Sequence, residues 1–266
     1  MLSGGLLGLA VGAILGLTGA GGGIFAVPAL VFGLDMDMRA AAPIALAAVG
    51  MAAGLGALQG LREGIVRYKA ATVLAATGAI TAPFGITLAH WLPVSWLNLI
   101  FVIIMLLVAY RMAMSARRPG ADDALAMERP AFCKVSTETG RFIWGWGTAA
   151  ALGSIGAVTG VFTGMLGVGG GFIIVPALSY FTELRMQSIV ATSLMVVALL
   201  STVTIFAAGS QGAAFTASAW AFVAASLTGM AVARLFANRI PSRVLQRIFA
   251  VACVAVAAIM LMRNIA

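Results

Sequence analysis

Long apolar runs, separated by short polar connections, occupy most of the chain. Six of these runs are close to the roughly 20 residues that an α-helix needs to cross a bilayer. They cover residues 39–60, 70–90, 95–114, 187–209, 217–238 and 244–263. Two longer runs, 2–34 and 142–181, are each interrupted by a cluster of glycines. Because backbone groups in lipid must be hydrogen-bonded internally, the pattern predicts an all-α, polytopic helical bundle with about eight hydrophobic segments.

The composition supports a membrane environment. Hydrophobic residues make up 62% of the 266 positions and charged residues only 9%, whereas soluble domains carry about 25% charged residues. The net charge of +8 comes mostly from Lys and Arg between the apolar runs and at their ends. Membrane orientation produces this distribution, so we expect a lipid bilayer and no nucleic acid as partner.

The second half of the chain repeats the first. An offset of 148 residues aligns the two halves without a gap and places V-P-A-L at 27–30 on V-P-A-L at 175–178. The same register brings Phe101 onto Phe249. The glycines Gly19, Gly21, Gly22 and Gly23 fall on Gly167, Gly169, Gly170 and Gly171. A register that holds across a whole half predicts two homologous units.

The repeat divides the chain into three parts. Residues 1–115 and 142–266 are the two predicted transmembrane repeats. Residues 116–141 between them are rich in charge and predict a water-exposed, cytoplasmic linker.

Equivalent connections in the two halves have opposite charge bias. Segment 61–69 carries three basic residues, whereas the equivalent segment 209–214 carries none. The following connection shows the reverse, because 90–95 carries none and its equivalent carries Arg239 and Arg243. Since Lys and Arg are retained on the cytoplasmic side, the pattern predicts that the halves insert in opposite orientations.

Opposite orientation requires an odd number of crossings in each half. Three runs of each half are single spans, so the glycine-interrupted run must cross zero times or twice. Helices over 2–17 and 24–34 reach only about 24 Å and about 17 Å, less than the roughly 30 Å of hydrocarbon. A re-entrant hairpin with its tip at the glycines is therefore favoured. Segment 142–166 is long enough to cross alone, which leaves eight spans with parallel halves as the alternative.

The two glycine clusters are the predicted functional elements. Consecutive glycines can turn successive N–H groups to one side as an anion-binding nest. The helix that follows adds its free N–H groups and the positive end of its dipole. Two hairpins entering from opposite faces would bring these tips together near the midplane, as in transporters built from inverted repeats. Close helix packing is the alternative explanation, weaker for two aligned G-x-G-G-G runs than for scattered glycines.

Hydroxyl side chains near the clusters add candidate donors. They can bind an oxyanion or bond back to a helix carbonyl, and the sequence leaves both open. The predicted substrate-binding set is Thr18, Gly19, Gly21, Gly22, Gly23, Gly167, Gly169, Gly170, Gly171, Thr192 and Ser193. No carboxylate falls within a predicted span, which disfavours a cation pathway and favours an anionic substrate.

The segments GLTGAGGGIFAVPAL and GMLGVGGGFIIVPAL, from Gly16 and Gly164, and ATSL at 191–194 resemble the sulfite exporter TauE/SafE family of membrane transporters. The resemblance covers nearly the whole chain. It implies a multi-pass transporter of the bacterial-type inner membrane for small sulfur-containing oxyanions such as sulfite or organosulfonates. The first half departs from the pattern, with Pro-Ile-Ala-Leu at 43–46 in place of ATSL.

Transport of a small anion by alternating access is the predicted function. No Ser/His pair, Asp pair or metal-ligand set lies within the spans, so we expect no enzyme, no cofactor and no metal. The alternative is a non-transporting membrane scaffold or a subunit of a larger membrane complex. The sequence leaves open the particular anion, the direction of transport, the coupling ion and the oligomeric state.

Overall fold

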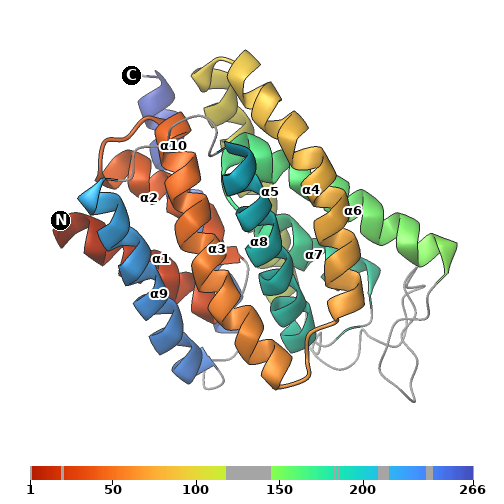
Figure 1. The fold of residues 1–266 in the computed structure, drawn as a ribbon. Helices are drawn as coiled ribbons and strands as arrows, with labels where there is room; N and C mark the ends of the chain where they lie inside the picture. The colour runs from red at the N-terminus through yellow and green to blue at the C-terminus, as the bar shows by residue number, and fades with distance from the viewer. Residues whose placement is uncertain are drawn as a thin grey trace.

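The described residues are almost entirely helical (Figure 1). The computed structural model describes residues 2–18, 21–117, 145–182, 184, 186–208, 216–237 and 242–265. Within these ranges the chain forms ten α-helices and one short 3-10 helix. The prediction of an all-α bundle is confirmed. Gly19 and positions 118–141 of the predicted linker lie outside the described residues.

Each unbroken apolar run forms one helix, and each glycine-interrupted run is divided into two, so the eight predicted segments correspond to ten α-helices. The first half contains α1 (Leu2–Thr18), η1 (Gly21–Phe25), α2 (Ala26–Gly33), α3 (Met38–Arg62), α4 (Tyr68–Trp91) and α5 (Val94–Arg117). The second half contains α6 (Trp146–Leu166), α7 (Gly171–Phe181), α8 (Met186–Ala208), α9 (Ala217–Ala237) and α10 (Ser242–Ile265).

Five of the described helices are long and apolar enough to cross a membrane. By length and composition, the candidate spans are Ala40–Arg62, Tyr68–Trp91, Val94–Arg111, Trp146–Leu166 and Gln187–Phe206. Helices α2 and α7, with 8 and 11 residues, are too short to cross alone. With the composition, these lengths indicate a multi-pass membrane protein in which two short helices end inside the bundle.

The two halves interlock by exchanging their first helices. Helix α1 lies along α9 of the other half, and α6 lies along α4 (Figure 1). Glycines allow the backbones to meet: Gly8 lies against the carbonyl oxygen of Phe222, and Gly12 lies against that of Ser226. Along both helices the contacts advance toward the C-terminus, so α1 and α9 run parallel. The small residues of these helices thus serve close packing between the halves.

Helices α3 and α8 form the central pair and run antiparallel. A β-carbon on Gly50 would lie 2.5 Å from the Cβ of Ser201, and one on Gly60 would lie 2.9 Å from the Cβ of Ala191. The contacts therefore advance along one helix while they go back along the other. Helices α5 and α10 form a further pair. Two pairs of helices that the 148-residue offset makes equivalent, α3 with α8 and α5 with α10, thus lie against each other.

Candidate functional site

The first glycine cluster lies at the tip of a helical hairpin. Gly22 lies directly against the backbone of Leu15 in α1, which leaves no space for a side chain. At the other end of the hairpin, Gly33 of α2 lies against the side chain of Leu7 of α1. The outer ends of both helices are therefore neighbours. Between them the chain forms the 3-10 helix Gly21–Phe25.

The second glycine cluster reverses the chain through left-handed backbone. The φ angles of Gly167, Gly169 and Gly170 are 71°, 75° and 68°, a region that side chains disfavour by roughly 1–2 kcal/mol per residue. The N–H of Gly167 donates to the carbonyl oxygen of Thr163 at 2.9 Å and ends α6. Gly170 lies against Thr159 and Thr163, so α7 begins beside the last turns of α6.

The far ends of this second hairpin also lie near one another. Helix α6 runs parallel to α4, because Gly156 contacts Leu74 near the start of α4 and Gly164 contacts Ala82 farther along. Helix α7 ends beside α5, where the guanidinium of Arg111 lies 5.7 Å from the ring centre of Tyr180. Helices α4 and α5 are consecutive, so the start of one and the end of the other lie at the same end of the bundle (Figure 1).

The two tips differ in conformation although their sequences align. Among the described tip residues, only the glycines of the second cluster have positive φ. In the first cluster, the 3-10 helix continues directly into α2 and supplies acceptors for its first N–H groups. Helix α7 instead begins at Gly170, which provides no side-chain cap hydrogen bond. The N–H groups of Ile173 and Ile174 donate to the carbonyl oxygen of Gly170 at 3.0 Å and 3.3 Å, which leaves those of Gly171 and Phe172 as the candidate donors of this N-terminus.

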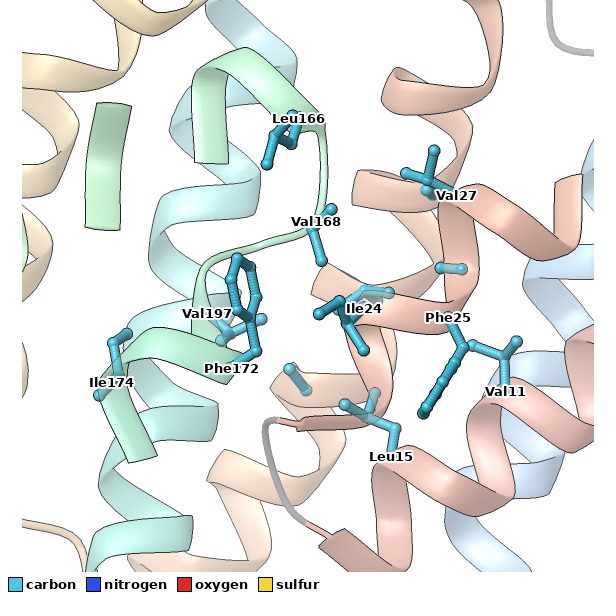
Figure 2. Packing of buried hydrophobic residues seen from close by; sticks show 14 of the residues in the cluster. Val11, Leu15, Ile24, Phe25, Val27, Leu166, Val168, Phe172, Ile174 and Val197 are labelled. Carbon is cyan, nitrogen blue, oxygen red and sulfur yellow. The ribbon is translucent and has the colours of Figure 1, made fainter. Parts of the chain in front are cut away.

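The two tips meet each other beside the middle of α3, and the second tip also contacts the middle of α8. Figure 2 shows Val168 of the second tip beside Ile24 of the first. A β-carbon on Gly23 would lie 3.0 Å from the carbonyl oxygen of Val168 and 3.0 Å from a methyl group of Val49. A β-carbon on Gly169 would lie 3.1 Å from a methyl group of Val197 and 3.4 Å from one of Val49. All five residues are buried. We call them, Gly23, Val49, Val168, Gly169 and Val197, the central junction.

One side chain beside the central junction is buried without a hydrogen bond. The Oγ of Ser201 on α8 has no partner among the described residues, and the residue is 0% exposed. On the same helix, Thr202 and Thr204 donate to carbonyls one turn back at 2.8 Å and 2.7 Å. An unmade buried hydrogen bond costs about 1–3 kcal/mol. Ser201 therefore carries a hydrogen-bonding group without a protein partner beside the central junction.

Sequence analysis does not single out Ser201. A lone serine within an apolar run has no distinguishing pattern, and only the packing of α3 and the second glycine tip around it isolates its hydroxyl. One signal was present in the sequence: the repeat places Ser201 on Ala53, so this hydroxyl exists in one half only.

The predicted hydroxyls of α8 lie away from the central junction. The Oγ1 of Thr192 accepts a hydrogen bond of 3.0 Å from the backbone N–H of Arg67, which joins α8 to the connection before α4. The rise along the helix from Thr192 to Ser201 is about 13 Å. Ser193 donates to the carbonyl oxygen of Val190 at 2.8 Å. Both residues have protein partners, and their role in substrate binding stays a prediction.

Thr18 lies at the end of α1, beside the first glycine tip. Its Oγ1 donates to the carbonyl oxygen of Ile14 at 2.7 Å. Gly21 begins the 3-10 helix and Gly171 begins α7, so both belong to the tips as the sequence predicts. The structure thus places the described glycines of the predicted set in the two tips, which meet where Gly23 lies beside Val168.

The chain is similar to a known family of membrane proteins. The sequence model of the family described as "Sulfite exporter TauE/SafE" matches residues 5–260. A curated relative, a "Probable membrane transporter protein" of Xylella fastidiosa strain Temecula1, is 27% identical and covers 98% of this chain and 94% of its own length. A relative of the same description from strain 9a5c is 26% identical with the same coverage. No solved structure matches the chain.

Proposed function

Since the chain belongs to the sulfite exporter TauE/SafE family, we propose that it moves small sulfur-containing oxyanions, such as sulfite or organosulfonates, across the bacterial-type inner membrane by alternating access. The chain is a multi-pass membrane transporter of that family. The observation that carries the proposal is the meeting of both glycine tips at the central junction.

The anion binds where the tips meet. The N–H groups of Gly171 and Phe172, at the N-terminus of α7, and the positive end of the helix dipole stabilise an anion. Absent side chains at the glycines let the anion approach the backbone. The described carboxylates Asp35, Asp37 and Glu63 lie in exposed connections, so none of them repels an anion at the junction. Gly19 completes the proposed set from outside the described residues.

The two repeats, 1–115 and 142–266, lie in the membrane in opposite orientations, joined by a cytoplasmic linker at 116–141. The antiparallel packing of α3 and α8 supports this arrangement, because equivalent helices of parallel halves would run in the same direction. The basic connection after α3, with Arg62 and Lys69, then faces the cytoplasm. The two glycine-tipped segments are re-entrant hairpins.

Alternating access follows from the burial of the central junction. An anion reaches it only when the packing around a tip opens on one side. The hairpin helices are suited to this movement, because Pro28 and Pro176 lie inside α2 and α7 and each removes one helix hydrogen bond. Opening one hairpin while the other stays closed exposes the junction to one face of the membrane at a time.

Transport in proteoliposomes tests the proposal. Purified protein is expected to take up or exchange radiolabelled sulfite or sulfoacetate in a saturable manner, with protein-free liposomes as the control. If none of these anions moves under any imposed ion or voltage gradient, the transport proposal fails. A non-transporting scaffold or subunit of a membrane complex then becomes the better explanation.

A further inference from the structure

We propose that Ser201 is a substrate-binding residue whose hydroxyl donates a hydrogen bond to an oxygen atom of the transported anion. The inference rests on the proposed function. It adds a side-chain donor to a site otherwise formed by backbone.

The position of Ser201 is shaped by glycines on two other elements. Its Oγ would lie 3.2 Å from a β-carbon on Gly50 of α3 and 3.4 Å from one on Gly169 of the second tip. Neither glycine has a side chain that could accept the hydroxyl proton. The closest elements therefore leave the hydroxyl without a partner, beside the place where the two tips meet.

The groups beside Ser201 favour an anion over a cation. The serine hydroxyl and the N–H groups of Gly171 and Phe172 can donate, and the central junction itself contributes the carbonyl oxygen of Val168. A cation would need several oxygen ligands. The described carboxylates lie in exposed connections away from the junction. A small oxyanion, with several acceptor oxygens around one centre, can accept hydrogen bonds from several such donors at once.

The site is one-sided despite the repeat. The first half has the fully buried Ala53 at the position equivalent to Ser201. It also has a 3-10 helix in place of the left-handed turn. Both unused donors, the hydroxyl and the α7 N-terminus, thus belong to the second half. The second half supplies the donors, and the first half covers them.

The test compares Ser201→Ala with Ser226→Ala in purified, detergent-solubilised protein. Ser226 is a matched control because it is 2% exposed and its hydroxyl already donates to the carbonyl oxygen of Phe222 at 2.8 Å. Thermal unfolding is measured against potassium sulfite and potassium methanesulfonate, with potassium chloride at equal ionic strength. Bound anion stabilises the folded protein by RT ln(1 + L/Kd), where L is the free anion concentration, so at a given concentration an anion of higher affinity raises the unfolding temperature more.

We expect Ser201→Ala to unfold without ligand at the parent temperature or above, because its hydroxyl has no partner. Its anion affinity should fall about tenfold or more. Ser226→Ala should keep the parent's affinity. Ser201→Cys keeps a weak donor of similar size and should give an intermediate affinity.

Three results would overturn the inference. Lower stability of ligand-free Ser201→Ala with unchanged anion affinity would assign the hydroxyl to structure. A stabilisation by sodium that Ser201→Ala abolishes, with anion binding intact, would make the ligand a cation. If no anion stabilises the parent protein, the proposed function itself fails, a result distinct from an unchanged affinity in the variant.

Discussion

At the scale of single residues, the glycines of the second tip hold a backbone that other residues resist. Gly170 combines a φ of 68° with direct contact to Thr159 of α6. Any side chain at this position is strained by the backbone and also collides with α6. Both effects act on the turn that connects α6 to the N-terminus of α7.

We therefore predict that Gly170→Ala destabilises the protein by about 2–4 kcal/mol, the combined effect of left-handed backbone and overpacking. Sulfite uptake should fall with it, since the turn also positions the α7 donors. Gly54→Ala on α3 is the control, because its nearest neighbour, the Cβ of Ala198, would be 4.0 Å away. Chemical denaturation in detergent and proteoliposome uptake measure both effects, and equal stability of the two variants would contradict the prediction.

At single positions, the sequence predicts structure best for residue types that have few structural roles. Aligned glycine clusters point to tips because few other residues tolerate such turns. Hydroxyl side chains make many kinds of hydrogen bond. The sequence therefore does not predict that Thr192 accepts from the N–H of Arg67, which lies 125 residues away. Ser201 was missed for the same reason: its environment comes from two distant segments.

At the scale of helices, close pairing depends on glycines that face backbone. Gly160 of α6 lies against the carbonyl oxygen of Gly78 of α4. Gly153, two turns earlier on α6, would place a β-carbon 3.7 Å from a methyl group of Thr77, an ordinary contact. Within one helix, close packing thus requires a glycine at Gly160 but not at Gly153.

Gly160→Ala is expected to push α4 and α6 apart and to destabilise the protein by about 1–3 kcal/mol. Gly153→Ala should be neutral or stabilising by up to about 1 kcal/mol, because alanine favours the helix. Denaturation of the two purified variants under the same conditions decides between them. Similar losses in both would show that the α4–α6 contact does not govern stability.

The helices themselves were predictable, but their partners were not. Run length and the glycine interruptions predicted the helices and the two breaks, because lipid permits few other structures. These helices are apolar on most of their surface, so the sequence gives no preferred face. The exchange of α1 and α6 between the halves therefore emerged only from the structure.

At the scale of the whole molecule, the antiparallel packing of α3 and α8 predicts the membrane topology. In opposite insertion, the connection at Glu63 is cytoplasmic, while Ser95 and Thr216 lie on the outer side. Parallel halves would instead place Glu63 and Thr216 on the same side. All three residues are exposed, so each is a suitable site for a reporter.

Single cysteines at Glu63, Ser95 and Thr216 should report this arrangement. They are introduced after replacement of Cys133 and Cys253 with alanine, and labelled in intact cells with a membrane-impermeant maleimide. Ser95→Cys and Thr216→Cys should react from outside, and Glu63→Cys only after the membrane is permeabilised. Labelling of Glu63→Cys and Thr216→Cys from one side would support parallel halves.

The exchange of first helices also bears on how the protein is made. Helix α1 leaves the ribosome long before α9, the helix along which it lies in the finished molecule. Until α9 is synthesised, the glycine-lined face of α1 has no protein neighbour. The nascent chain must therefore remain in the bilayer with this face exposed, or be held by the insertion machinery.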